Sequence, residues 1–110
     1  MHRLPPALAA TATPRILELL GEPPARVLEL GFAGIHAAAL HLAGFDVVVV
    51  EPDAEHLARA AQRAGGALSA VPAELFDAVV AHEGDDLSAV MARRAILVGQ
   101  DGSAWSSDSF

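Results

Sequence analysis

An acidic residue, Glu51, is placed to bind a nucleoside beside a glycine-containing turn. Glu29 precedes Gly31 at the end of a short apolar run, and Glu51 directly follows a second apolar run. Glycine at 31 and at Gly34 lets the backbone turn tightly and brings N–H groups close to a ligand. A carboxylate about 20 residues after such a turn can accept hydrogen bonds from both hydroxyls of a ribose. The spacing therefore predicts a nucleoside-binding unit over residues 26–53.

A histidine and a glutamate follow a third apolar run, at 76–81. Ligands lie outside the carboxyl ends of strands in open α/β sheets, so His82 and Glu83 are placed to contact a substrate or to act as a base. A structural or merely exposed histidine is the alternative for His82. Cysteine is absent, and the histidines are not spaced as ligands on one element, so we predict no metal site.

Strands and helices must alternate to position these groups. Four short apolar runs predict strands, and the segments between them have helical length and pattern. The pattern indicates one domain over 1–110, an α/β Rossmann-like three-layer fold with a short, mainly parallel sheet. Residues 1–12 form a lead-in, and 100–110 a turn and tail. The strands are expected at 26–30, 47–50, 76–81 and 95–98, and we expect the parallel core to have the spatial order 47–50, 26–30, 76–81, 95–98.

The predicted helices differ in how clearly they begin. Thr13 is expected to cap a helix before Gly21, and Asp53 is more plausible as the cap of the next helix than as a ligand contact. A helix at 34–43 is expected to bury Ile35, Ala38, Ala39 and Leu42, and the helix after Asp53 to bury Leu57, Ala60, Ala61 and Ala64. A short helix is expected from Asp85 or Asp86 through Arg93.

Residues 67–71 are too close to the next strand to form a full third strand at the sheet edge. From a strand at that edge, the chain would have to cross the sheet and run back along the length of a strand before it could begin the strand at 76–81. That path is about 21 Å long. The residues 72–75 that remain span at most about 17 Å. We therefore expect 67–71 to be a stub at best, and Glu74, which could otherwise contact an adenine, to be an ordinary solvated glutamate.

Composition narrows the partners and the location. The net charge is −7, and the seven basic residues are scattered arginines, which disfavours nucleic acid. No apolar run approaches the roughly 20 residues that span a bilayer, and the N-terminal stretch does not resemble a signal peptide. The cytoplasm is the expected location. An apolar strand at 95–98 needs cover, from the tail 103–110, a homodimer or a larger partner subunit.

Three short sequence motifs, in this order, resemble motifs of the class I S-adenosylmethionine-dependent methyltransferases. They are Val-Leu-Glu-Leu-Gly at 27–31, Val-Val-Glu-Pro-Asp-Ala-Glu-His-Leu at 49–57 and Phe-Asp-Ala-Val-Val-Ala-His at 76–82, within a resemblance that covers roughly 17–99. The resemblance implies S-adenosylmethionine as cofactor, a sheet truncated at its C-terminal end, and His82 facing the methyl acceptor. It implies a cofactor site made by Glu29, Gly31, Ala33, Gly34, Glu51 and Pro52.

The sequence also departs from that family in ways that leave its function open. Ala33 stands where a second glycine is expected, and the turn is one residue shorter. A methyl group there can block a ligand if φ must be positive. The expected function is methyl transfer to a small-molecule or protein acceptor. The alternative is a catalytically inactive scaffold or accessory subunit with the same fold, and a dinucleotide-binding module ranks lowest because of Ala33 and His36.

Overall fold

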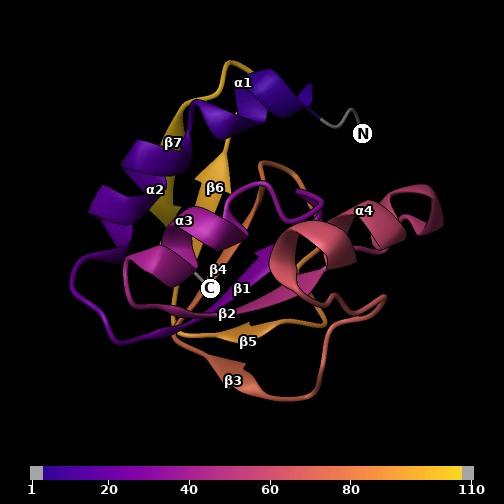
Figure 1. Ribbon diagram of the computed structural model, residues 1–110. Helices are drawn as coiled ribbons and strands as arrows, with labels where there is room; N and C mark the ends of the chain where they lie inside the picture. The colour runs from indigo at the N-terminus through magenta and orange to yellow at the C-terminus, as the bar shows by residue number, and fades with distance from the viewer. Residues whose placement is uncertain (1–3, 108–110) are drawn as a thin grey trace.

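A computed structural model describes residues 4–107, which form a five-stranded sheet with helices packed on it (Figure 1). The strand order is β2–β1–β4–β6–β7. The strands of this sheet are β1 (Arg26–Leu30), β2 (Asp46–Val50), β4 (Ala78–His82), β6 (Ala95–Val98) and β7 (Ala104–Ser107). The helices are α1 (Pro6–Ala10), α2 (Thr13–Leu20), α3 (Ala37–Leu42) and α4 (Ala54–Ala64), and a small second sheet pairs β3 (Leu75–Phe76) with β5 (Met91–Ala92).

The predicted order of the parallel strands is confirmed. Strands β2, β1, β4 and β6 are mutually parallel, with Val27 opposite Val47 and Ala78, and Val80 opposite Ile96. Strand β7 is antiparallel and covers β6, with Trp105 opposite Leu97. Part of the expected tail therefore covers the last parallel strand, while residues 108–110 lie outside the described range.

All four helices pack on one face of the sheet. Residues of this face, such as Val27, Val80 and Ile96, contact Ile16 of α2 and Leu40 of α3. The α4 helix packs on the same face through a separate cluster of small residues around β2. Figure 1 shows α1 to α3 grouped over one part of the sheet and α4 over another. The helices therefore bury their apolar residues against one face of the sheet only.

The opposite face is covered by extended chain instead of helices. Leu28, Val79 and Ala95 of this face pack against Phe76 of β3 and Val90, which precedes β5. The fold is thus the expected Rossmann-like α/β arrangement with a mainly parallel sheet, and its third layer is the β3–β5 sheet with its flanking loops. This thin layer leaves Leu75 and Met91, which pair with each other, about half exposed.

The predicted stub at 67–71 is also confirmed. Leu68 forms a single parallel bridge to Val50. Its N–H donates to Val49 O at 2.9 Å, and its carbonyl accepts from Glu51 N at 2.8 Å. Within residues 4–107, β2 has no other pairing on the edge away from β1, so the sheet ends there after this one bridge.

The predicted helix from Asp85 or Asp86 to Arg93 is wrong. Asp86 Oδ1 accepts from Ser88 N at 3.0 Å in a local turn, and the chain continues as strand β5. Val90 is buried against the sheet face that has no helix. The need to cover that face outweighs the local helical pattern, because an extended segment reaches over more of the sheet per residue than a helix does.

The buried face predicted for the 34–43 helix is also wrong. Helix α3 begins at Ala37 and buries Ala37 and Leu40, while Leu42 is 87% exposed. The turn holds residues 31–36, so the helix begins later and its buried stripe differs. Thr13 lies inside α2 and does not cap it, and the lead-in 1–12 contains α1. The Asp53 cap is confirmed, with its Oδ1 accepting from Glu55 N at 3.0 Å, and Ala60 on the predicted stripe is fully buried.

Candidate functional site

The carboxylate of Glu29 holds the turn after β1 through two hydrogen bonds. Its Oε1 accepts from Gly34 N at 2.7 Å, and its Oε2 accepts from His36 N at 3.0 Å. The side chain of Glu29 is fully buried. Burial raises the pKa of Glu29 to about 7, and the N–H groups of Gly34 and His36 oppose that rise. Glu29 therefore organises the turn by binding its backbone.

The turn needs left-handed backbone at three positions. The φ angles are +77° at Gly31, +52° at Ala33 and +77° at Gly34. Ala33 is the unfavourable member of the set, since a residue with a Cβ rarely adopts positive φ. Gly34 serves packing as well, because a Cβ there would lie 3.2 Å from the carbonyl oxygen of Ala60 in α4. The glycine at 34 thus allows the turn to approach α4 closely.

Glu51 is buried at the carboxyl end of β2 and faces the same turn. Its Oε1 accepts from Ala33 N at 3.0 Å, and its Oε2 accepts from Asp53 N at 3.0 Å. Its exposed fraction is zero. The carboxylate predicted to bind ribose hydroxyls therefore binds the backbone of the turn. Pro52 next to it is exposed, and a proline side chain has no group that could hydrogen-bond a ligand.

Phe32 and His82 fill the space between the turn and the end of β4. Their rings stack with centroids 4.0 Å apart and an interplanar angle of 19°. Phe32 is 1% exposed and His82 is 7% exposed. His82 Nδ1 lies 3.7 Å from Asp85 Oδ2, and its Nε2 is buried without a hydrogen-bond partner in the described part of the chain. His82 is at the predicted edge of the sheet, but an aromatic ring covers it.

His36 belongs to the same buried group. Its ring meets Phe32 edge-on at 4.8 Å, and its Nδ1 lies 2.7 Å from the hydroxyl oxygen of Thr13. Its Nε2 has no hydrogen-bond partner within residues 4–107. Burial, together with a smaller contribution from the nearby His82, lowers the pKa of His36 to about 4. His36 is therefore a neutral ring that joins α2 to the turn.

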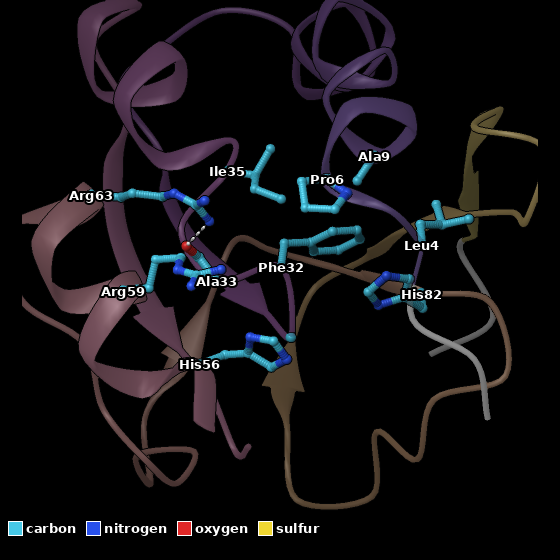
Figure 2. Close-up of a pocket in the computed structure, with 11 residues that line it drawn as sticks. Leu4, Pro6, Ala9, Phe32, Ala33, Ile35, His56, Arg59, Arg63 and His82 are labelled. Atoms are coloured by element: carbon cyan, nitrogen blue, oxygen red, sulfur yellow. Dashed lines mark hydrogen bonds between the residues drawn. The ribbon is translucent and has the colours of Figure 1, made fainter. Parts of the chain in front are cut away.

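A small cleft opens beside the Phe32–His82 stack (Figure 2). Its volume is about 70 Å³. Figure 2 shows Leu4, Pro6 and Ala9 on one side of Phe32, with His56, Arg59 and Arg63 of α4 on the other. Arg63 donates to Ala33 O at 3.0 Å. The cleft is therefore apolar on one side and basic on the other.

The arrangement does not fit an S-adenosyl nucleoside as it stands. A ribose cannot lie between Glu51 and the turn, because the Glu51 Oε1 to Ala33 N distance is a direct hydrogen bond. The cleft of about 70 Å³ is well below the roughly 300 Å³ at which pockets for such ligands begin. Phe32 occupies part of the remaining space. Cofactor entry would require the turn to detach from both carboxylates.

The structure brings together most of the predicted site residues. Glu29, Gly31, Ala33, Gly34, Glu51 and His82 all lie at the carboxyl edge of β1, β2 and β4, and Pro52 lies at its rim. Glu74 is not among them. Its carboxylate pairs with Arg26 at 2.6 Å, and Arg26 begins β1, so Glu74 lies at the opposite edge of the sheet.

Sequence reasoning missed Phe32, Arg59 and Arg63. A bulky aromatic residue between the glycines of a nucleotide-binding turn was a signal that the turn could be filled from within. Arg59 and Arg63 lie four residues apart on α4, so they share a helix face, but the sequence did not indicate that this face overlooks the turn. Only the packing of Gly34 against α4 brings them there.

Comparisons with known proteins place the fold and nothing finer. No family profile matches the sequence, and no curated protein matches it. A solved structure described as the crystal structure of Thermoplasma acidophilum 1320 is similar, with a TM-score of 0.63 and 18% identity. The match covers 83% of this chain and 58% of that one, so the chain spans less than two thirds of its neighbour. At this identity the likeness shows the fold alone.

Two further observations concern membrane-spanning helices and metal-binding side chains in the described part of the molecule. None of the helices within residues 4–107 is long and apolar enough to cross a membrane. In the same range, histidine, aspartate and glutamate side chains do not gather in groups of three that could hold a metal ion.

Proposed function

We propose that the protein is a catalytically inactive, methyltransferase-like domain that acts as a scaffold or accessory subunit. The observation that carries the proposal is the bonding of Glu51. Its carboxylate accepts the N–H groups of Ala33 and Asp53, so the groups that would hold a ribose hold each other. The stacked rings of Phe32 and His82 support the same conclusion, since they fill the space in front of the turn.

The energy of opening the turn also favours this function. Detaching the turn breaks the hydrogen bonds of Gly34 and His36 to Glu29, and that of Ala33 to Glu51. A buried hydrogen bond contributes roughly 0.5–1.5 kcal/mol, and roughly 1.5–3 kcal/mol when one group is charged, so breaking three of them costs several kcal/mol before a cofactor contributes anything. A bound cofactor would have to recover this cost, which lowers its apparent affinity.

A second candidate, an S-adenosylmethionine-binding methyltransferase, is favoured by one specific observation. Glu29, the glycine turn and Glu51 meet at the edge where β1 lies between β2 and β4, and the chain passes from one side of β1 to the other between these strands. Such switch points are where open α/β sheets bind ligands. In this candidate the turn would open, and Glu51 would exchange Ala33 N–H for ribose hydroxyls.

Calorimetric titration with S-adenosylmethionine, S-adenosylhomocysteine and NAD separates the two candidates. The inactive domain is expected to bind none of them at millimolar ligand, and its thermal midpoint should not move. Micromolar binding of the first two, but not of NAD, would reject the scaffold and support the methyltransferase.

A matched pair of variants then tests whether any binding uses the predicted residue. Glu51→Gln removes the carboxylate that faces the turn, while Glu83→Gln removes an exposed one at the same edge. For a cofactor-binding protein, only Glu51→Gln should weaken the affinity, by about tenfold or more. For the scaffold, Glu51→Gln should lower stability without any effect on ligand titrations.

A further inference from the structure

The small cleft beside Phe32 has two chemically different walls (Figure 2). The apolar wall is formed by Leu4, Pro6, Phe32 and Ile35, and the basic wall by side chains of α4. Leu4 is buried and Ile35 is partly buried, so this wall is held by the core and is not a loose loop. A ligand that fits both walls must be apolar at one end and negatively charged at the other.

The basic wall carries two arginines and a histidine. His56, Arg59 and Arg63 fall on one face of α4, in a chain whose net charge is −7. Arg63 is held to Ala33 O, and His56 Nε2 lies 3.6 Å from Asp53 Oδ2. Arg59 makes no hydrogen bond or ion pair with any residue between 4 and 107, although Glu55 lies one helical turn away. Its guanidinium is therefore available to a ligand.

One residue that lines the cleft has a buried polar atom without a hydrogen-bond partner among residues 4–107. His82 lines it, is 7% exposed, and leaves Nε2 without a hydrogen bond. Leaving such a group unsatisfied is unfavourable, and a native structure that tolerates one often has a ligand or water to satisfy it.

We propose that this cleft binds a small organic carboxylate with a short apolar chain. A guanidinium matches the planar carboxylate with parallel N–H donors, which assigns the charged end to Arg59. The chain would lie against Leu4, Pro6 and Phe32, and the volume of about 70 Å³ admits only a few carbon atoms. Inorganic phosphate fits less well, because its oxygens would face the apolar wall without donors.

This inference goes beyond the scaffold proposal and does not rest on it. The carboxylate would occupy the cleft with the turn closed, and it would not need the Glu51 bonds to break. A failure of carboxylate binding leaves the cofactor titrations unaffected, and cofactor binding leaves the carboxylate titration to be judged by itself. The two ideas therefore fail separately.

The test is a titration of the full chain, followed by NMR chemical shifts, with butyrate, butyramide and inorganic phosphate at constant ionic strength. Butyramide has the same shape as butyrate without the charge. Butyrate is expected to bind with a dissociation constant of about a millimolar, a reasonable affinity for so few atoms, and at least about tenfold more tightly than the other two. Equal binding of butyrate and butyramide, tighter binding of phosphate, or no binding by butyrate would overturn the proposal.

Variants of two exposed arginines locate the binding. Arg59→Gln should weaken butyrate binding about tenfold and leave folding unchanged, since Arg59 is exposed and makes none of the observed hydrogen bonds. Arg93→Gln is the matched control, because Arg93 is also exposed but lies near Asp77, at the opposite edge of the sheet. Equal effects of the two substitutions would mean that butyrate responds to net charge and not to the cleft.

Discussion

The turns that follow β1 and β4 leave neighbouring strands at the same edge of the sheet, yet they are held very differently. The turn after β1 is bonded to the buried carboxylates of Glu29 and Glu51. The turn after β4 is held by Asp85, which accepts from His82 N at 3.2 Å, and by the exposed Asp86. Water competes for the second set of bonds and not for the first.

The difference shows how buried carboxylates at the edge of a sheet can hold a turn instead of a ligand. In the turn after β1, both carboxylates bind backbone N–H groups, and the freed space is taken by Phe32. In the turn after β4, the bonds are at the surface, so this side of the edge is the easier one to rearrange. Substitutions that remove each kind of bond test the contrast directly.

The largest expected effect is that of Glu29→Ala compared with Asp85→Ala. Removing Glu29 leaves the N–H groups of Gly34 and His36 buried without acceptors, which should lower the free energy of unfolding by about 3–5 kcal/mol. Removing Asp85 frees one partly exposed N–H and should cost less than about 1 kcal/mol. Urea unfolding measures both. Similar losses in the two variants would show that burial of the bonds does not distinguish the turns.

The next effect concerns His36, whose ring packs under the turn after β1. Because its pKa is lowered from 6.5 to about 4, the unfolded state binds a proton in this window while the folded state does not. The contribution of His36 to stability is therefore complete above pH 6.5 and is lost as the pH falls toward 4. The loss is at most about 3 kcal/mol.

The measurement is the free energy of unfolding of the protein and of His36→Gln between pH 4 and 7. The free energy of unfolding of the unsubstituted protein should fall relative to that of His36→Gln as the pH falls. His41→Gln, at an exposed position on α3, is the control and should give a curve parallel to that of the unsubstituted protein. A flat difference for His36→Gln would mean that the ring is not held in a neutral form.

The sequence was sufficient for the features that depend on local pattern and chain length. Glycines after an apolar run predicted the turn, a carboxylate after the second run placed Glu51 beside it, and the reach of residues 72–75 predicted the stub at Leu68. The order of the parallel strands was expected from the arrangement in the resembled family, and the structure has that order. These inferences needed no knowledge of which side chains meet in space.

The features that depend on which side chains meet could not be derived. Glu51 looked the same whether it faced a ribose or the N–H of Ala33, and only the closeness of the turn decides between them. The segment after His82 had helical pattern and apparent caps, but Val90 is needed to cover the face of the sheet without helices. Tertiary packing overrode local propensity there, as it often does for short segments.

The smallest expected effect is a gain of stability in the turn after β1 from Ala33→Gly. Ala33 has a φ of +52°, where a Cβ is strained and glycine is not, so the substitution should raise the free energy of unfolding by about 1 kcal/mol or less. Ala38→Gly is the matched control at an exposed position in α3, where loss of helix propensity should cost up to about 1 kcal/mol. Thermal and urea unfolding of both variants should therefore give changes of opposite sign. Destabilisation by both would mean that the conformation of Ala33 is relaxed and that the turn stores no strain at this position.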